Sequence, residues 1–267
     1  MSGKRLRLTR ILSRIDGRSV ILPLDHGVTL GPILGIERLE ATVEAGCRGG
    51  ADALILHKGM LRCLESATGR IPGMIMHLSA STELGPSCHH KVLVGTVEEA
   101  LRLGADGVSF HLNLGSDHEP EMLRDLGTIG RSCDDWQVPL LVMAYPCGDR
   151  IGNSVSDAHV AHAARVAAEL GADIIKIPFP EDFGILARIS SSLAVPIVVA
   201  GGESMKVEDT LEKIHRSLQA GTSGVAAGRN VFQQPDPEAV LKAICDIVHR
   251  GFSAKDALDN LRAGPSN

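Results

Sequence analysis

Three absences narrow the function of this sequence before any motif is considered. Aromatic residues make up only 3% of its 267 residues, so aromatic side chains cannot fill the core. The 27 basic side chains are outnumbered by 32 acidic ones, and the net charge of −5 argues against binding to nucleic acid or to a membrane surface. No apolar run approaches the roughly 18 residues that span a bilayer, and the N-terminus lacks a signal-peptide pattern. We therefore expect a cytoplasmic protein.

The cysteines also lack a pattern, because none of them forms a C-x-x-C pair or a close cluster. The six cysteines are Cys47, Cys63, Cys88, Cys133, Cys147 and Cys245. Disulfide frameworks are typical of short secreted chains, so we interpret these residues as reduced thiols, most of them small buried apolar groups.

What the sequence does contain is 29 glycines and many small apolar residues, which gather in eight short runs. The runs are Val20–Leu24, Ala53–His57, Met74–Leu78, Val108–Leu112, Leu140–Ala144, Ile174–Ile177, Ile197–Ala200 and Val225–Ala227. Continuous runs are typical of parallel strands buried on both faces. Segments with helical periodicity separate them, for example Val97–Leu103, His159–Leu170 and Val207–Leu218. Repeated units about 30 residues long predict a (β/α)8 barrel, a fold of about 250 residues, as a single domain over residues 1–267.

The links before the predicted strands support this fold. Three of them read Gly-Ala-Asp: Gly50-Ala51-Asp52, Gly104-Ala105-Asp106 and Gly171-Ala172-Asp173. Glycine suits the left-handed residue that ends a helix. An open doubly wound sheet is the alternative, but no glycine-rich nucleotide motif follows its first strand. The first 18 residues alternate basic and apolar side chains, which predicts a short helix packed against the barrel rather than a polyanion site.

Lys176 is the most informative candidate for catalysis. It lies between Ile175 and Ile177, where a charged ammonium is costly unless it is paired. Burial favours the neutral amine, which is the nucleophile that forms a Schiff base with a ketone. The alternative is a lysine that reaches solvent or pairs with an acid. Barrel enzymes carry their catalytic groups at strand ends, and this favours the nucleophile.

Two further strand ends carry groups that could move protons beside an imine. Tyr145 is the only tyrosine in the chain, and its phenol could donate or accept a proton. Asp25 closes the first predicted strand and could act as a base or bind a hydroxyl group. Each has a structural alternative, because Tyr145 could cover the barrel rim and Asp25 could cap a helix.

The last two predicted strands end in glycine-rich turns, which favour a phosphate site. Gly201 and Gly202 follow one strand, and Gly228 and Arg229 follow the other. Barrels often bind phosphate at these positions through backbone N–H groups, and arginine adds a charged two-pronged contact.

Histidines offer a competing interpretation. The ends of the first four predicted strands carry His26, His57, His77 and His111, which could converge on a zinc ion that polarises a carbonyl group. No H-x-H or H-x-x-x-H spacing organises them. A separate pair, His89-His90, lies in the long stretch after the third strand, where we expect a mobile loop over the barrel.

These residues resemble the barrel-type class I aldolases of archaeal type, most closely the 2-amino-3,7-dideoxy-D-threo-hept-6-ulosonate synthases. The resemblance covers nearly the whole chain. It is carried by Pro23-Leu24-Asp25-His26-Gly27-Val28, Leu56-His57-Lys58-Gly59, His77-Leu78-Ser79, His111-Leu112-Asn113-Leu114-Gly115-Ser116-Asp117, Tyr145-Pro146, Gly171-Ala172-Asp173-Ile174-Ile175-Lys176, Ala200-Gly201-Gly202 and Gly228-Arg229-Asn230-Val231-Phe232-Gln233. It implies that Lys176 is the Schiff-base lysine, Tyr145 the proton donor and Asp25 the general base.

The resemblance also implies a substrate site. Gly201, Gly202, Gly228 and Arg229 would hold the phosphate of the donor, and we expect His26, Pro146 and Cys147 to contribute to the same site. No cofactor and no metal are expected, because the lysine amine itself activates the ketone. Related enzymes form rings, so the resemblance implies a homo-oligomer, a pentamer or decamer.

The implied reaction is that of an aldolase or transaldolase which joins a phosphorylated ketone to an aldehyde such as L-aspartate semialdehyde. Such enzymes serve aromatic amino acid biosynthesis or, with dihydroxyacetone phosphate as donor, secondary metabolism.

Three sites depart from the family pattern. Cys147 stands where arginine is common, and Ile177-Pro178-Phe179 stands where a small polar pair and an aromatic residue are frequent. Met143 replaces an aromatic residue that is usual in fructose-bisphosphate aldolases, which disfavours that substrate. Fructose-bisphosphate aldolase, an acyl-transferring relative that acts on a phosphorylated signal molecule, and a non-catalytic sugar-phosphate-binding barrel stay as alternatives.

Overall fold

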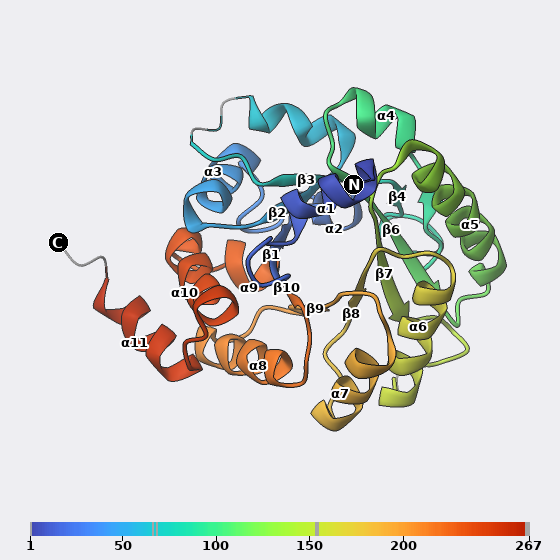
Figure 1. Cartoon of the computed structure of the whole chain (residues 1–267). Helices are drawn as coiled ribbons and strands as arrows, with labels where there is room; N and C mark the ends of the chain where they lie inside the picture. Colours follow the sequence, from blue (N-terminus) through green and yellow to red (C-terminus); the bar gives the residue numbers. More distant parts are fainter. Residues whose placement is uncertain (1, 66, 68, 153–154, 265–267) are drawn as a thin grey trace.

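Eight parallel strands close into a barrel, with helices around its outside (Figure 1). The computed structural model describes residues 2–65, 67, 69–152 and 155–264. Around the barrel the strands follow the order β1-β10-β9-β8-β7-β6-β3-β2. They span β1 Ser19–Pro23, β2 Ala53–Leu56, β3 Gly73–His77, β6 Gly107–Leu114, β7 Leu140–Pro146, β8 Ile174–Ile177, β9 Ile197–Ala200 and β10 Gly224–Ala226. The predicted (β/α)8 barrel is confirmed, and all eight strands begin and end within two residues of their predicted bounds.

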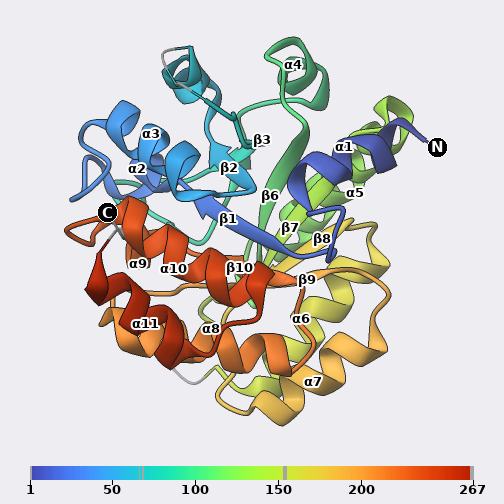
Figure 2. The same cartoon turned by 60° about the vertical axis from the view of Figure 1, so that its left-hand side comes forward.

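Helices alternate with the strands along most of the chain. They span α1 Gly3–Ile11, α2 His26–Leu30, α3 Leu39–Gly49, the 3-10 helix η1 Lys58–Leu64, α4 Val97–Arg102, α5 Glu119–Trp136, α6 Asp157–Glu169, α7 Phe183–Ser192, α8 Val207–Gln219, α9 Arg229–Phe232, α10 Pro237–Arg250 and α11 Ala254–Ala263. Figure 2 shows the C-terminal helices α10 and α11 packed beside α8. None of the helices in the described ranges is long and apolar enough to cross a lipid bilayer.

A two-stranded ribbon after β3 was not predicted from the sequence. After β3 the chain forms a two-stranded antiparallel ribbon, β4 Ser79–Ala80 and β5 Val92–Leu93, before it reaches α4. The intervening residues 81–91, which we call the 81–91 loop, therefore start and end next to each other, at the paired strands β4 and β5.

Successive side chains of each strand point to opposite faces, and this alternation builds two cores. The larger core lies between the strands and the surrounding helices and includes Val108, Phe110 and Leu112 of β6. The smaller core fills the barrel and includes Leu141 and Met143 of β7. Because Lys176 has the same parity as the inward-facing Ile174, its side chain belongs to the barrel interior.

The Gly-Ala-Asp links do more than end helices. Their glycines adopt the predicted left-handed conformation, with φ of 88° at Gly50, 83° at Gly104 and 92° at Gly171. Each aspartate accepts a hydrogen bond from a backbone N–H of the preceding barrel strand. The pairs are Val20 N to Asp52 (2.8 Å), Met74 N to Asp106 (2.9 Å) and Leu140 N to Asp173 (2.9 Å). The carboxylates therefore satisfy buried backbone donors at the N-terminal end of the barrel.

The N-terminal helix α1 covers this end of the barrel, as predicted. Ile11 is 1% exposed and packs into the smaller core inside the strands. Lys4 forms ion pairs with Asp173 and Asp134, and Arg10 pairs with Asp106. These basic residues are thus matched by carboxylates, which supports a structural role for the segment.

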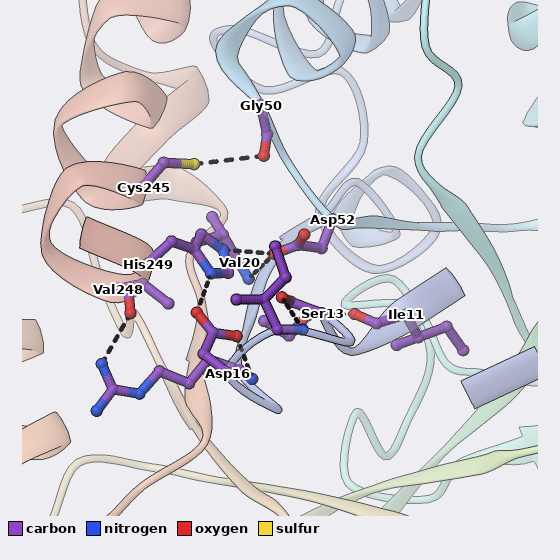
Figure 3. Close-up of polar contacts among 12 residues, drawn as sticks. Ile11, Ser13, Asp16, Val20, Gly50, Asp52, Cys245, Val248 and His249 are labelled. Carbon is purple, nitrogen blue, oxygen red and sulfur yellow. Dashed lines mark hydrogen bonds and ion pairs between the residues drawn. The ribbon is translucent and has the colours of Figure 1, made fainter. Parts of the chain in front are cut away.

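His249 of α10 ties three segments together at the same end (Figure 3). Its Nδ1 lies 2.8 Å from Asp16, in the turn before β1, and its Nε2 lies 2.8 Å from Asp52, just before β2. Hydrogen bonds to Asp52 and Asp16 raise the pKa of His249 although burial opposes them. The imidazole therefore links α10 to the start of two barrel strands.

Candidate active site

The C-terminal ends of the strands, here called the barrel mouth, bring most of the predicted site residues together. A cavity of about 340 Å³ lies there. Its lining includes His26, Tyr145, Lys176, Gly201, Gly202, Gly228 and Arg229. Asp25 adjoins it, since Asp25 Oδ1 lies 3.7 Å from His26 Nδ1. The residues proposed for imine chemistry and for phosphate binding therefore share one hollow.

Lys176 is buried at the base of this cavity, with 7% of its surface exposed. No carboxylate of the described residues lies within 4.0 Å of its amine, and the recorded neighbour of Nζ is Met143 Sδ at 4.0 Å. The flanking Ile175 and Ile177 belong to the outer core and point away from the amine. The sequence analysis attributed the burial of Lys176 to these flanking isoleucines. In the structure the burial comes from the barrel interior instead. An amine that is held in a pocket and not paired with an acid is suited to attack a carbonyl carbon.

Asp25 is the carboxylate at the centre of the mouth. Burial alone would raise its pKa, but electrostatic interactions with His77, His26 and Lys176 outweigh burial and lower the pKa below its ordinary value. His77 Nε2 lies 3.9 Å from Asp25 Oδ2. Asp25 is therefore ionised at neutral pH, as a base or a stabiliser of an iminium ion must be.

The four strand-end histidines lie around this carboxylate as neutral imidazoles. Burial lowers the pKa of His77 to about 3, and it also lowers the pKa values of His26, His57 and His111. His77 Nδ1 lies 2.8 Å from Ser109 Oγ, and the rings of His57 and His77 are 5.2 Å apart. Within the part of the chain that the structure describes, no three His, Cys, Asp or Glu side chains are placed to hold a metal ion. The imidazoles therefore shape and polarise the mouth around Asp25.

Tyr145 reaches the same cavity from β7, and its ring lies 4.9 Å from the ring of His111 on β6. It has the parity of Met143, so it points inward above the lysine. The phenol is thus placed on the strand next to Lys176, where it could exchange a proton with groups on the amine.

The glycine-rich turns after β9 and β10 form the opposite wall of the cavity. Gly202 has φ of 72°, a conformation that L side chains rarely adopt. A Cβ on Gly228 would lie 2.7 Å from His26 Cε1, so only glycine allows the imidazole to approach this turn. Arg229 begins α9, and its Nε is buried without a hydrogen-bond partner. A buried guanidinium donor without a partner, beside open backbone, is suited to an anion such as phosphate.

Sequence reasoning missed the residue that holds these turns in place. Asn230 is fully buried, and its amide donates to the carbonyl groups of Gly201 and Glu203 and accepts from the backbone N–H of Met205. It therefore fixes the β9 turn against α9. Asn230 belongs to the motif Gly228–Gln233, but the motif alone does not predict these contacts.

Lys213 of α8 was also missed, because a lysine inside an amphipathic helix normally faces solvent. It lines the cavity, and its Nζ lies 5.9 Å from the centre of the Phe179 ring. Lys213 thus adds a second cation to the wall that carries Arg229.

Two of the expected substrate-site residues lie elsewhere. Pro146 has the outward parity of β7 and lines a separate crevice with Leu114 and Ile151. Cys147 follows β7, two strands along the barrel from β9, and its Sγ lies 3.1 Å from His89 Nδ1. His89 belongs to the 81–91 loop, which is tied to β6 as well through the hydrogen bond from Asn113 Nδ2 to the His89 carbonyl group. Gly201, Gly202, Gly228 and Arg229 form the wall of the cavity that we call the phosphate wall, after its predicted ligand. The structure does not bring Pro146 or Cys147 to this wall.

A larger cavity of about 880 Å³ lies at the other end of the barrel, between the turn before β1, α3 and α10. Its cations are largely paired: Arg48 with Glu44 and Glu238, Lys242 with Glu238, and Arg250 with Asp246. We place the active site at the smaller hollow, because catalytic groups of barrel enzymes lie at the C-terminal ends of the strands.

Comparison with known proteins agrees with this geometry. The chain is 41% identical over 248 residues to a 2-amino-4,5-dihydroxy-6-oxo-7-(phosphonooxy)heptanoate synthase of Streptomyces griseus, covering 92% of this chain and 90% of that protein. It is 41% identical over 259 residues to a 2-amino-3,7-dideoxy-D-threo-hept-6-ulosonate synthase of Archaeoglobus fulgidus, covering 97% and 96%. A Klebsiella pneumoniae 3-hydroxy-5-phosphonooxypentane-2,4-dione thiolase is 30% identical, covering 96% and 84%.

Solved structures and a family model point the same way. A Schiff-base-forming fructose-1,6-bisphosphate aldolase superposes with a TM-score of 0.84 at 30% identity, covering 92% of this chain and all of the other. The model of the DeoC/LacD family aldolases matches residues 19–234. The chain therefore belongs to the DeoC/LacD family of aldolases and is an enzyme of the aldolase class.

Proposed function

We propose that this enzyme joins a phosphorylated three-carbon ketone, such as dihydroxyacetone phosphate, to L-aspartate semialdehyde through a Schiff base on Lys176. One observation carries the proposal. The unpaired amine of Lys176 and the unpartnered Nε of Arg229 face a single cavity of about 340 Å³. A donor that carries a ketone and a phosphate in one small molecule matches both groups.

The products named for two of the relatives support the acceptor. The Streptomyces name describes a seven-carbon acid with a ketone at carbon 6 and a hydroxyl at carbon 4. An aldol bond between carbons 4 and 5 divides it into dihydroxyacetone phosphate and 2-amino-4-oxobutanoate, which is aspartate semialdehyde. The Archaeoglobus name divides at the same bond and gives the same four-carbon half. We carry this shared acceptor over to the present enzyme.

The proposed reaction assigns a step to each residue. The Lys176 amine adds to the ketone carbon, and water leaves to form an iminium ion. Asp25 accepts a proton from the neighbouring carbon, which converts the iminium ion to an enamine. The enamine carbon attacks the aldehyde, a C–C bond forms, and Tyr145 donates the proton that the new alkoxide needs. Water then hydrolyses the product iminium ion and returns the free amine.

Reduction with borohydride tests the Schiff base. Dihydroxyacetone phosphate is added to the enzyme, borohydride reduces the C=N bond to a stable secondary amine, and peptide mass mapping locates the adduct. We expect the adduct on Lys176, no adduct in Lys176→Met, and an unchanged adduct in Lys58→Met, a control lysine that pairs with Glu99 outside the cavity. An adduct on another lysine, or none, would contradict the proposal.

Turnover then identifies the reaction. We expect the phosphorylated seven-carbon product from dihydroxyacetone phosphate and L-aspartate semialdehyde, detected by mass spectrometry. Fructose bisphosphate formed faster from glyceraldehyde 3-phosphate would favour the fructose-bisphosphate alternative. Acyl transfer to coenzyme A would favour the alternative of an acyl-transferring enzyme that acts on a phosphorylated signal molecule. Inactivation by a chelator would favour the zinc mechanism. A borohydride adduct on Lys176 without turnover of any tested substrate would favour a binding protein.

A further inference from the structure

A second positive site lies at the barrel mouth, across from the phosphate wall. It is formed by Lys91, the last residue of the 81–91 loop, which is 8% exposed. Its Nζ donates a hydrogen bond of 2.6 Å to Ser81 Oγ, and Ser81 Oγ donates in turn to the carbonyl group of Cys88 at 2.7 Å. Both ends of the loop thus hold the ammonium group in place.

No acid among the described residues neutralises this charge. The structure places no carboxylate of residues 2–65, 67, 69–152 or 155–264 within 4.0 Å of the Lys91 amine. Burial lowers the pKa of Lys91, while the more distant Asp25 and the thiols of Cys88 and Cys147 act against that shift. A buried ammonium that lacks an anionic partner is costly, and an anion supplied by a ligand would remove that cost.

Strand pairing and loop contacts place Lys91 beside the C-terminal ends of β3, β6 and β7. Lys91 directly precedes β5, whose Leu93 pairs with Ser79 just after β3, and His89 of the same loop bonds to Asn113 of β6 and lies against Cys147 after β7. The charge of Lys91 lowers the pKa values of His57, just after β2, of His77, at the end of β3, and of His111, within β6. It is the charged group that acts most strongly on His111, ahead of Lys176. The ammonium group therefore belongs to the half of the mouth formed by these strands.

The strand order fixes the direction of the substrate. In the closed order β1-β10-β9-β8-β7-β6-β3-β2, the pair β3 and β6 lies opposite the pair β9 and β10. The phosphate wall follows β9 and β10, whereas Lys176 projects from β8 and Asp25 follows β1. A donor that is bound to Lys176 with its phosphate at Arg229 therefore presents its free carbon towards β3 and β6, and the acceptor must approach from that side.

We propose that Lys91, held by Ser81, binds the carboxylate of the acceptor aldehyde. This inference rests on the proposed function, which supplies an acceptor with an aldehyde at one end and a carboxylate at the other. The ammonium group orients the aldehyde towards the enamine and selects anionic acceptors over neutral ones of the same length. Cys147 lies on the same side of the mouth and brings no positive charge to it.

Substitution of Lys91 by methionine tests this assignment, because methionine keeps the unbranched chain and removes the charge. A charged hydrogen bond to a carboxylate is lost, so we expect KM for L-aspartate semialdehyde to rise roughly 10- to 100-fold while kcat changes little. Succinic semialdehyde, which keeps the carboxylate and lacks the amine, should suffer the same loss. For butanal, an uncharged aldehyde of equal length, KM should rise less than about threefold. The KM of Lys91→Arg for L-aspartate semialdehyde should lie close to that of the wild type.

Three further arms separate the possible outcomes. Borohydride trapping of dihydroxyacetone phosphate on Lys176 should be unchanged in Lys91→Met, and failure of trapping in the wild type would refute the proposed function rather than this inference. If only glyceraldehyde 3-phosphate lost affinity, the anion would be a phosphate and the carboxylate assignment would be wrong. If Lys91→Met does not fold, Ser81→Ala provides a second test and should raise KM for L-aspartate semialdehyde a few-fold. The control variant Lys58→Met should leave that KM unchanged. Equal losses for butanal and the semialdehydes, or no loss at all, would overturn the assignment.

Discussion

We predict that Arg229 makes the enzyme prefer phosphorylated donors over unphosphorylated ones. Its Nε is buried without a partner, and none of the described carboxylates lies within 4.0 Å of its guanidinium group. Arg229→Gln keeps a planar polar group but removes the charge. A hydrogen bond to a charged group contributes about 1.5–3 kcal/mol, so kcat/KM for dihydroxyacetone phosphate should fall roughly 10- to 150-fold.

The assay compares two donors with the same acceptor. Initial rates are measured with dihydroxyacetone phosphate and with dihydroxyacetone, each with L-aspartate semialdehyde, in the wild type, Arg229→Gln and Arg229→Lys. The unphosphorylated donor should change by less than about threefold, and Arg229→Lys should be intermediate, because lysine keeps the charge but not the two-pronged geometry. Arg216→Gln is the matched control, since Arg216 stacks on Phe183 at 4.0 Å, outside the cavity. Equal losses with both donors would show that Arg229 supports the fold or the chemistry rather than the phosphate.

Three other substitutions separate catalysis, positioning and stability. Asp25→Asn removes the base, so kcat should fall roughly 10²- to 10⁴-fold while the borohydride adduct on Lys176 still forms; loss of the adduct would place Asp25 in an earlier step. Asn230→Ala breaks three recorded hydrogen bonds to the β9 turn, so urea unfolding should show a loss of roughly 2–4 kcal/mol and KM for the donor should rise. His249 has a pKa raised above 6.5 by Asp52 and Asp16, so the folded state binds the proton more tightly than the unfolded chain. The wild type should therefore lose melting temperature as pH rises above 6.5 through that raised pKa, and a His249→Gln variant with the same slope would refute this explanation.

The sequence predicts the barrel well because its strands are continuous apolar runs and its links repeat. The inward direction of Lys176 follows from the same period of two that builds the barrel core. The sequence does not predict the ribbon of β4 and β5, since two-residue strands carry no periodic signal. The position of Lys91 could not be foreseen either, because it depends on a hydrogen bond to Ser81 across the loop and on contacts of the same loop with Asn113 and Cys147, which lie far away along the chain. The roles of Asn230 and Lys213 also depend on tertiary contacts.

The distribution of paired and unpaired charge distinguishes the two ends of this acidic barrel. At the N-terminal end of the barrel, basic side chains meet carboxylates, as Lys4 and Arg10 show. At the mouth, Lys176, Arg229 and Lys91 have no carboxylate of the described residues within 4.0 Å. Unpaired cations in a partly desolvated hollow create a strong local field even when the net charge is −5. Arg229 follows β10, Lys91 lies beside β3 and β6 on the opposite side of the barrel, and Lys176 projects from β8, so the arrangement suits the proposed reaction, which joins two anionic molecules end to end.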